Sequence, residues 1–485
     1  MTALSEFRPV MLVTGALVAT LGVAMLLPAL VDLAADNNDW MIFASAGMVT
    51  ILFGFGLFIA NRGAPKGLST RQAMLMTVVS WVALVAFGAL PFHWSGIVPS
   101  YTDAFFESMS GLTTTGATVI TGLDTAPPGI LFWRGLLQWL GGLGIIVMAI
   151  AVLPMLQIGG MQLFKAEAFD TAEKILPRAT QISTSITLVF IAITGVCAIA
   201  YLAVGMAADD ALIHAMTTVA TGGFSSKDAS IGHFANAGVE WVAIIFMILG
   251  SIPFILYVQM LQGRFRPIVA DQQVKAFMGF LAVAVIAGWM MAHFGEHHLG
   301  LDGLRYAAFN VISIVTGTGY SSTDYGQWGA HSVAFFFIIM FVGGCAGSTS
   351  CGIKIFRFQV FFEAVRQHIA QVMYPHGVFR AHFNGKPIEQ RVIASVMSFF
   401  FLFMTSFVVL AMLLRLSGLD TITSLSGAGT ALANVGPGLG DIIGPAGNFQ
   451  PLSDVQKWLL SAGMLLGRLE LFTVLVLLLP RFWRS

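Results

Sequence analysis

Long apolar stretches and short, half-polar segments alternate along this chain in a regular order. Two apolar stretches, 9–33 and 40–60, come first and are separated by a polar run at 36–39. After them, a long stretch, a short segment and a second long stretch follow one another four times. About 20 apolar residues cross a bilayer as a helix, so the pattern predicts ten full crossings. The eight in the repeated part are 72–92, 130–156, 182–205, 237–261, 275–294, 332–365, 392–414 and 455–480.

The four short segments lie at 102–113, 209–220, 302–315 and 420–433, and they are too short to cross a bilayer. Each has an aspartate near its start, where we expect it to cap a helix by accepting from free backbone N–H groups; these are Asp103, Asp209, Asp302 and Asp420. Lipid cannot satisfy the ends of such a helix, so they must lie in protein or beside water. We therefore expect four half-crossings.

A glycine-centred loop follows each short segment. The loops are Thr114-Thr115-Gly116-Ala117, Ala220-Thr221-Gly222-Gly223, Gly317-Thr318-Gly319-Tyr320 and Asn434-Val435-Gly436-Pro437. Their central glycines, Gly116, Gly222, Gly319 and Gly436, are 106, 97 and 117 residues apart. The simple alternative is four extracellular loops with incidental glycines. A period of about a hundred residues favours four repeats that direct backbone carbonyls at a dehydrated cation on a shared axis.

Composition places most of this chain in lipid. Lys, Arg, Asp and Glu make up only 10% of 485 residues, hydrophobic residues make up 57%, and the mean hydropathy is +0.83. A soluble domain carries about 25% charged residues, so membrane lipid is the expected surrounding. The net charge is zero, which argues against a nucleic-acid partner. Three scattered cysteines and the scattered histidines have no metal-ligand spacing, so we expect no metal or organic cofactor held by such side chains.

The distribution of Lys and Arg gives an orientation. The apolar stretch after Arg8 is longer than a signal-peptide core and is expected to remain as the first span. A cytoplasmic N-terminus puts most of the 24 basic residues on the cytoplasmic side, including Arg62, Lys66, Arg71, Lys165, Lys174, Arg178, Arg264, Arg266, Lys275, Arg357, Arg366, Arg380, Lys386, Arg391, Arg481 and Arg484. The glycine loops then face outward, and both termini are expected to be cytoplasmic.

Three segments of the chain resemble the Trk/Ktr/HKT superfamily of potassium transporters, and within it the membrane subunits of bacterial Trk systems. They are Ser-Gly-Leu-Thr-Thr-Thr-Gly-Ala-Thr at 110–118, Ala-Thr-Gly-Gly-Phe-Ser at 220–225 and Asn-Val-Gly-Pro-Gly-Leu-Gly at 434–440. The resemblance covers nearly the whole chain. It implies an all-α polytopic membrane protein with four pseudo-symmetric helix–pore-loop–helix repeats around one ion pore, preceded by two extra transmembrane helices. The expected units are 1–66, 67–165, 166–268, 269–372 and 373–485.

The same resemblance implies a potassium-binding selectivity filter built from the four loops. We align Gly319 with the other signature glycines, although the third loop also has glycine at 317. The expected filter residues are Thr114, Thr115, Gly116, Ala220, Thr221, Gly222, Gly317, Thr318, Gly319, Asn434, Val435 and Gly436.

Ten consecutive small or polar residues interrupt the apolar stretch 332–365. Such a run has poor helix propensity, and irregular backbone inside a membrane lies beside a cavity or within protein. Close packing of helices through small residues is the alternative, whereas the glycine spacing excludes a nucleotide-binding P-loop. The resemblance implies a gate under the filter, formed by Gly343, Gly344, Cys345, Ala346, Gly347, Ser348, Thr349 and Ser350 of the segment 343–352.

Arg468 lies in the middle of the last apolar stretch. A buried arginine costs at least about 2.5–3.5 kcal/mol on insertion scales, so it should face water, ions or an acidic partner. A structural ion pair with another helix is one possibility, and Glu470, two residues on, points elsewhere on a helix. The resemblance implies instead that Arg468 faces the pore beside the gate. Arg134, at the outer surface, is expected to brace the filter.

The favoured function is potassium uptake across the bacterial inner membrane, with K⁺ as the transported ion. The resemblance further implies a homodimer and a cytoplasmic nucleotide-binding regulatory subunit, while the sequence leaves open whether another ion is cotransported. A sodium-conducting relative is the second hypothesis. In such relatives the first signature glycine tends to be serine, and here it is Gly116. A polytopic membrane enzyme is the third, but it would need a clustered polar catalytic set, which is not visible in the sequence.

Overall fold

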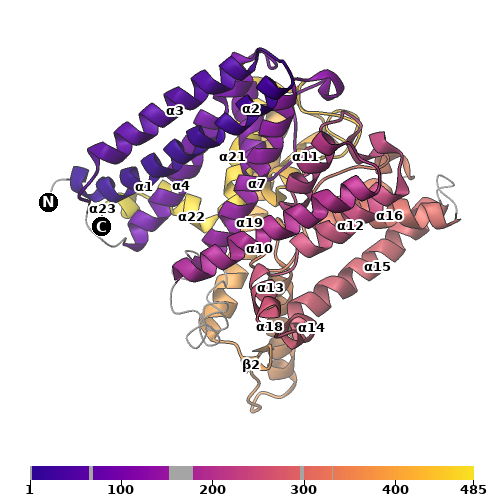
Figure 1. The fold of residues 1–485 in the computed structure, drawn as a ribbon. Helices are drawn as coiled ribbons and strands as arrows, with labels where there is room; N and C mark the ends of the chain where they lie inside the picture. Colours follow the sequence, from indigo (N-terminus) through magenta and orange to yellow (C-terminus); the bar gives the residue numbers. More distant parts are fainter. Residues whose placement is uncertain (1–2, 65–68, 152–178, 295–299, 330, 485) are drawn as a thin grey trace.

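The computed structural model describes residues 3–64, 69–151, 179–294, 300–329 and 331–484. Its first helices are α1 (Ala3–Ala24), α2 (Leu26–Ala34) and α3 (Trp40–Ala60). Helix α1 packs along both α3 and α4 (Thr70–Gly88) (Figure 1). The two ends of the chain lie at the same end of the molecule. The Arg71 guanidinium carbon, at the start of α4, is 5.2 Å from the centre of the Phe482 ring.

Four units of similar order follow, each with a long helix, a short helix and a further helical part. The first has α4 (Thr70–Gly88), α5 (Leu90–Trp94), α6 (Tyr101–Leu112) and α7 (Pro128–Ala151). The second has α10 (Ala179–Ala203), α11 (Ala208–Val219), α12 (Ala237–Gly250) and α13 (Phe254–Leu261). The third has α15 (Gln272–Phe294), α16 (Gly300–Val315), α17 (Ser332–Ile339) and α18 (Ile355–Met373), and the fourth has α19 (Gln390–Leu416), α20 (Thr421–Ala433), α21 (Asp454–Arg468) and α22 (Phe472–Leu475).

Smaller elements connect these helices. They are η1 (Leu123–Thr125), η2 (Ser230–Phe234), α14 (Arg266–Ala270), η3 (Tyr325–Gln327), η4 (Val476–Leu478) and α23 (Pro480–Arg484). Strands β1 (His382–Phe383) and β2 (Lys386–Pro387) form a hairpin near the far end of α18 (Figure 1). Asn384 and Gly385 make its turn with φ of 49° and 74°, as an Asn-Gly hairpin turn requires.

Of the ten predicted crossings, two are sharply bent, and a third is interrupted where its composition predicts an interruption. Within the described residues, seven spans are long and apolar enough to cross a membrane, and two more are helix pairs with sharp bends. The α12–α13 pair bends by 91° and the α21–α22 pair by 112°. The predicted stretch 332–365 is divided between α17 and α18 by the irregular segment 343–352, as its run of small and polar residues predicts. The end of the predicted stretch 130–156 and the boundary predicted at 165/166 lie outside the described residues.

The aspartates at the starts of the short helices do not all cap them. Asp420 does, because it is the N-cap of α20 and accepts from the Thr423 N–H at 3.1 Å. Hydrogen bonding by Thr423 holds the pKa of the Asp420 carboxyl below its usual range. In α6 the cap is Ser100, and Asp103 lies one turn inside. Asp209 and Asp302 also lie within the first turns of α11 and α16, where a negative charge still favours the helix dipole.

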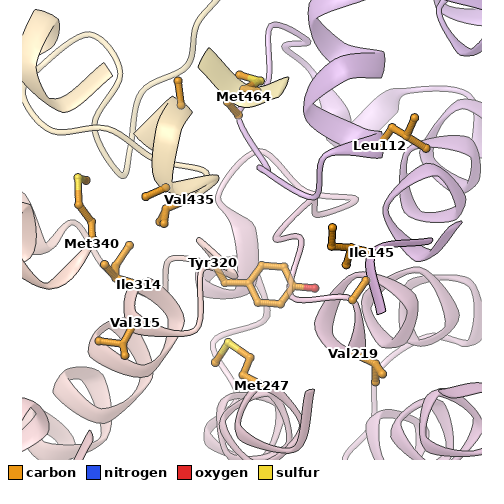
Figure 2. Close-up of a cluster of buried hydrophobic side chains, with 14 of the residues drawn as sticks. Leu112, Ile145, Val219, Met247, Ile314, Val315, Tyr320, Met340, Val435 and Met464 are labelled. Atoms are coloured by element: carbon orange, nitrogen blue, oxygen red, sulfur yellow. The ribbon is translucent and has the colours of Figure 1, made fainter. Parts of the chain in front are cut away.

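Apolar side chains cover the outside of the long helices. Met48 on α3, Ile199 on α10 and Phe401 on α19 are each about two-thirds exposed in the isolated chain. Exposed apolar surface on this scale identifies a face that contacts lipid or another protein. Buried apolar side chains from the ends of the short helices gather in one cluster (Figure 2).

Candidate ion-binding site

The four short helices all end in the same local structure. Each passes into a residue with left-handed backbone, namely Thr114 (φ 52°), Thr221 (φ 48°), Gly317 (φ 77°) and Asn434 (φ 51°). The Thr114 N–H donates to Gly111 O at 3.0 Å and the Thr115 N–H to Ser110 O at 2.9 Å. This pair of bonds is the Schellman motif. The Thr221 and Gly222 N–H groups make the corresponding bonds to Thr218 O and Thr217 O.

The shared left-handed residue fixes how the four loops correspond. Two residues after it stand Gly116, Gly223, Gly319 and Gly436. By backbone conformation, Gly319 therefore stands at the position of Gly116 and Gly436, and the extra Gly317 occupies the left-handed position. The alignment of the second loop is wrong by one residue: its signature glycine is Gly223, not Gly222. Ala220 is the C-cap of α11, with the same backbone conformation as Thr113 at the end of α6.

The four loops contact one another in a closed ring. A Cβ built on Gly116 would lie 2.3 Å from Gly222 O, and one on Gly223 would lie 1.8 Å from Thr318 O. A Cβ on Gly319 would lie 2.6 Å from Gly436 N. The ring then closes on the first loop, because a Cβ on Gly436 would lie 3.2 Å from Thr115 O. A side chain at Gly116, Gly223 or Gly319 would collide with the neighbouring loop, and one at Gly436 would press tightly against the first loop, which explains why glycine recurs there.

One buried side chain holds the second loop through a carbonyl group and an N–H group. Gln138 of α7 donates from Nε2 to Gly222 O at 2.6 Å, and its Oε1 accepts from the Phe224 N–H at 3.0 Å. Gln138 was not among the predicted site residues. The sequence feature that could have identified Gln138 is a single glutamine within the apolar stretch 130–156.

A buried ion pair supports the first two loops from outside. Arg134 Nε lies 2.8 Å from Glu107 Oε1, and both side chains are almost completely buried. Arg134 also donates to Ser225 O at 2.5 Å and lies over the Phe224 ring at 4.1 Å. The prediction that Arg134 braces the loops is thus confirmed by its contacts. Glu107 additionally accepts from the Val119 N–H at 2.9 Å.

Hydroxyl groups connect the third loop to the second short helix. Tyr201 OH lies 2.8 Å from Thr218 Oγ1, and Tyr320 OH contacts both Thr217 Oγ1 and Thr218 Oγ1. Tyr320 lies near the centre of Figure 2. In the chain it directly follows Gly319. The apolar residues around it come from the short helices, the helices behind them, the fourth loop and the end of α17. Those labelled are Leu112, Ile145, Val219, Met247, Ile314, Val315, Met340, Val435 and Met464.

Cavities lie on the two sides of the ring. The outer one, of about 70 Å³, is lined by Gly116, Gly223, Gly319 and Gly436 together with Arg134 and Lys227. The inner one, of about 30 Å³, is lined by Asn434, Cys351, Arg468, Lys354 and Glu470 among others. The glycine ring separates them, which is the arrangement that a narrow ion pathway needs.

The segment 343–352 lies directly below the ring and is not helical, as expected from its composition. Its ends are held together by the Gly343 N–H, which donates to Ile353 O at 2.9 Å. Thr349 Oγ1 donates to Val219 O at 3.0 Å, and Ser350 Oγ donates to Thr316 O at 2.7 Å. Helix C-termini leave carbonyl groups without partners, so these hydroxyls join the segment to the ends of α11 and α16.

Arg468 is the last residue of α21, immediately before the sharp bend, and not the middle of a straight helix. Its Nη1 lies 3.4 Å from Thr349 O and 2.8 Å from Cys351 Sγ, and its Nη2 lies 3.1 Å from Gly141 O. Glu470 instead pairs with Arg357 at the start of α18. Arg468 therefore connects the irregular segment to α7, with carbonyl and thiol acceptors in place of a carboxylate.

Arg134→Met should destabilise the folded chain. Removing one member of a buried ion pair leaves the other charge without compensation, which costs about 3–5 kcal/mol. We expect a lower melting temperature by calorimetry or fluorescence in detergent. Arg366→Met is the matched control, because its pair with Glu363 is exposed, and we expect a change within about 0.5 kcal/mol. Equal effects of the two changes would contradict the bracing role of Arg134.

The fold and the site together define a polytopic membrane protein in which four short helices hold one ring of glycine loops. Comparison with known proteins gives the family: the chain belongs to the TrkH family of cation transport proteins, which it matches over residues 40–485.

Named relatives match over almost their whole length. The Trk system potassium uptake protein TrkI of Halomonas elongata is 42% identical and covers 99% of this chain and 98% of its own. The Trk system potassium uptake protein TrkH of Escherichia coli K12 is 35% identical, covering 99% of this chain and 100% of its own. The crystal structure of the potassium transporter TrkH from Vibrio parahaemolyticus superposes with a TM-score of 0.91 at 34% identity, covering 99% and 100% of the two chains. The sequence resemblance and the predicted fold class are therefore confirmed, and these relatives are named as transporters, not enzymes.

Proposed function

We propose that this chain takes up potassium across the bacterial inner membrane through the ring of four glycine loops. The closed cycle of contacts from Gly116 to Gly222, Gly223 to Thr318, Gly319 to Gly436 and Gly436 to Thr115 supports this most directly. Rings of backbone carbonyls can replace the hydration shell of a cation. The membrane potential favours inward flow by about 2.3 kcal/mol per charge per 100 mV.

The filter then consists of three residues from each loop. Using the left-handed residue as the common reference, these are Thr114-Thr115-Gly116, Thr221-Gly222-Gly223, Gly317-Thr318-Gly319 and Asn434-Val435-Gly436. Left-handed φ recurs at alternate residues in the first three loops. This alternation turns successive peptide groups so that their carbonyls face the same side. The names of the relatives, all potassium uptake proteins, favour K⁺ over Na⁺ as the ion.

The segment 343–352 and Arg468 form the gate of this pathway. Both lie on the inner side of the ring, and hydrogen bonds join them to each other and to α7, α11 and α16. Arg468 is also a fixed positive charge beside the pathway, and it opposes a cation leaving the filter. Movement of the segment away from the ring would open the path.

A cytoplasmic nucleotide-binding subunit controls this gate in our proposal, and two copies of the chain form a homodimer. Arg8, Arg62 and Arg71 lie at the end of the molecule where the two termini meet. Arg8 donates to Arg62 O, and Arg71 lies over the Phe482 ring. Basic residues at one end favour the cytoplasmic side for both termini. Lys165, Lys174 and Arg178 lie outside the described residues.

Ion flux in liposomes tests the function. Purified chain is reconstituted with K⁺, Na⁺ or Li⁺ as the permeant ion, and uptake is followed under an imposed negative potential. We expect K⁺ uptake to exceed Na⁺ uptake. Equal rates for the two ions would favour the sodium-conducting alternative, and no flux of either ion with or without the regulatory subunit would reject the pore.

Potassium should also stabilise the purified chain. A ligand that binds only the folded state at 100 times its Kd adds about 2.7 kcal/mol. For a chain of this length, with an unfolding entropy of about 1 kcal/mol/K, the melting temperature should rise by about 2–3 °C. The comparison uses KCl, NaCl and LiCl at equal ionic strength. Identical melting temperatures would count against a potassium-selective site.

A further inference from the structure

The side chain of Cys351 touches several parts of the ion pathway at once. It is 5% exposed. Its Sγ lies 3.4 Å from Thr114 Oγ1 and 2.8 Å from Arg468 Nη1. On another side it faces the third loop, because a Cβ built on Gly317 would lie 3.1 Å from Cys351 Cβ.

These contacts place Cys351 on the axis of the ring. Thr114 and Gly317 hold the same left-handed position in the first and third loops. Contacts around the ring run from the first loop to the second, third and fourth and back, so the first and third loops lie opposite each other. A side chain that contacts the inner ends of two opposite loops lies between them. Cys351 also lines the inner cavity together with Asn434 of the fourth loop.

Thr349 and Ser350, the two residues before Cys351, bind the wall of the pathway and not the ring. Thr349 and Ser350 direct their hydroxyls to Val219 O and Thr316 O, at the ends of two short helices. Those bonds attach the segment to the wall of the pathway. Because these two residues are bound to the wall, the next residue, Cys351, faces the ring. Arg468 Nη1 contacts its sulfur at 2.8 Å.

We propose that the Cys351 side chain is the plug of the closed pathway, occupying the point at which an ion leaves the four loops. This inference rests on the proposed function and deepens it, because it identifies one side chain of the segment as the obstruction. Thr349 and Ser350 are then positioning residues. Opening requires that Cys351 separates from both Thr114 and Gly317.

Truncating this side chain should open the path without changing ion selectivity. In liposomes without any regulatory subunit, Cys351→Ala should raise basal K⁺ flux about tenfold or more, and the K⁺/Na⁺ flux ratio should stay at the parent value. Cys351→Ser, which keeps a side chain of similar size, should stay near the parent. Cys197→Ala is the matched control, since Cys197 is a buried thiol on α10, outside the gate segment. Increased flux with loss of selectivity would mean that the filter had collapsed, and this would overturn the proposal.

Silver ions test the position of the thiol on the path. In a Cys197→Ala/Cys345→Ala background, Cys351 is the single remaining cysteine. External Ag⁺ that passes the ring displaces the thiol proton, forms an S–Ag bond and releases one H⁺ to the solution. We expect block of flux activated by the regulatory subunit, slowed by external K⁺ more than by Na⁺, reversed by dithiothreitol and lost when Cys351 is also replaced by serine. This experiment keeps the Cys351 side chain in place, so its result does not depend on the folding of Cys351→Ala.

The outcomes separate this inference from the proposed function. If the parent protein carries no K⁺ under any condition, the pore itself is rejected. If the parent carries K⁺ selectively, while Cys351→Ala has parent flux and Ag⁺ block is insensitive to K⁺, the pore stands and the plug is rejected.

Discussion

Serine in place of Gly116 is expected to reduce the preference for potassium over sodium by about tenfold or more. Gly116 has a φ of 88°, and a Cβ there would lie 2.3 Å from Gly222 O. A side chain therefore strains its own backbone by about 1–2 kcal/mol and displaces a carbonyl of the next loop. A change of 1.4 kcal/mol in relative ion affinity is a factor of ten. Transport should persist, because three other loops still line the path.

The measurement is the ratio of K⁺ to Na⁺ uptake in liposomes, normalised to folded protein. Gly144→Ser is the matched control, because Gly144 lies in the neighbouring α7 and a Cβ there meets no atom within 4 Å. It should leave the ratio unchanged. A Gly116→Ser protein that retains the parent ratio would remove Gly116 from the selective site.

The sequence predicted the repeated architecture well because that architecture leaves local signals. Span length, short-helix length and glycine loops recur in the same order, and each is a property of a few neighbouring residues. No local feature of the sequence shows which loop contacts which around the ring. Gly223 was misplaced for a related reason: two adjacent glycines fit the motif equally, and only the left-handed Thr221 distinguishes them.

The bend between α12 and α13 could be predicted from the sequence, whereas the bend between α21 and α22 could not. Between α12 and α13 stand Ser251, Ile252 and Pro253, and a proline after glycine and serine is a recognised helix break. Between α21 and α22 no glycine or proline occurs, yet Glu470 and Leu471 have positive φ of 63° and 48°. That backbone is held by distant contacts: Glu470 pairs with Arg357, and Leu471 is buried. No local pattern predicts it.

Removing either Arg468 or the middle of the segment 343–352 is expected to raise basal potassium flux. Arg468→Ala removes hydrogen bonds to Thr349 O, Cys351 Sγ and Gly141 O, together with a positive charge beside the path. Deleting residues 346–349 removes the Thr349 attachment to Val219 O. The deletion is sterically reasonable, because residues beside its two ends are already joined: the Gly344 N–H donates to Ser350 Oγ at 2.8 Å. Each change should raise flux about tenfold or more without the regulatory subunit.

The double variant shows whether the two act as one gate. Residues that share contacts show coupling energies of about 0.5–3 kcal/mol. If Arg468 and the segment stabilise the same closed state, the combined change should raise flux by less than the product of the two single effects. A product of independent effects would indicate two separate barriers. If Arg468 were only a packing residue, its removal would lower the yield of folded protein and leave flux per folded protein unchanged. Flux normalised to monodisperse protein therefore decides between a gate and a structural contact.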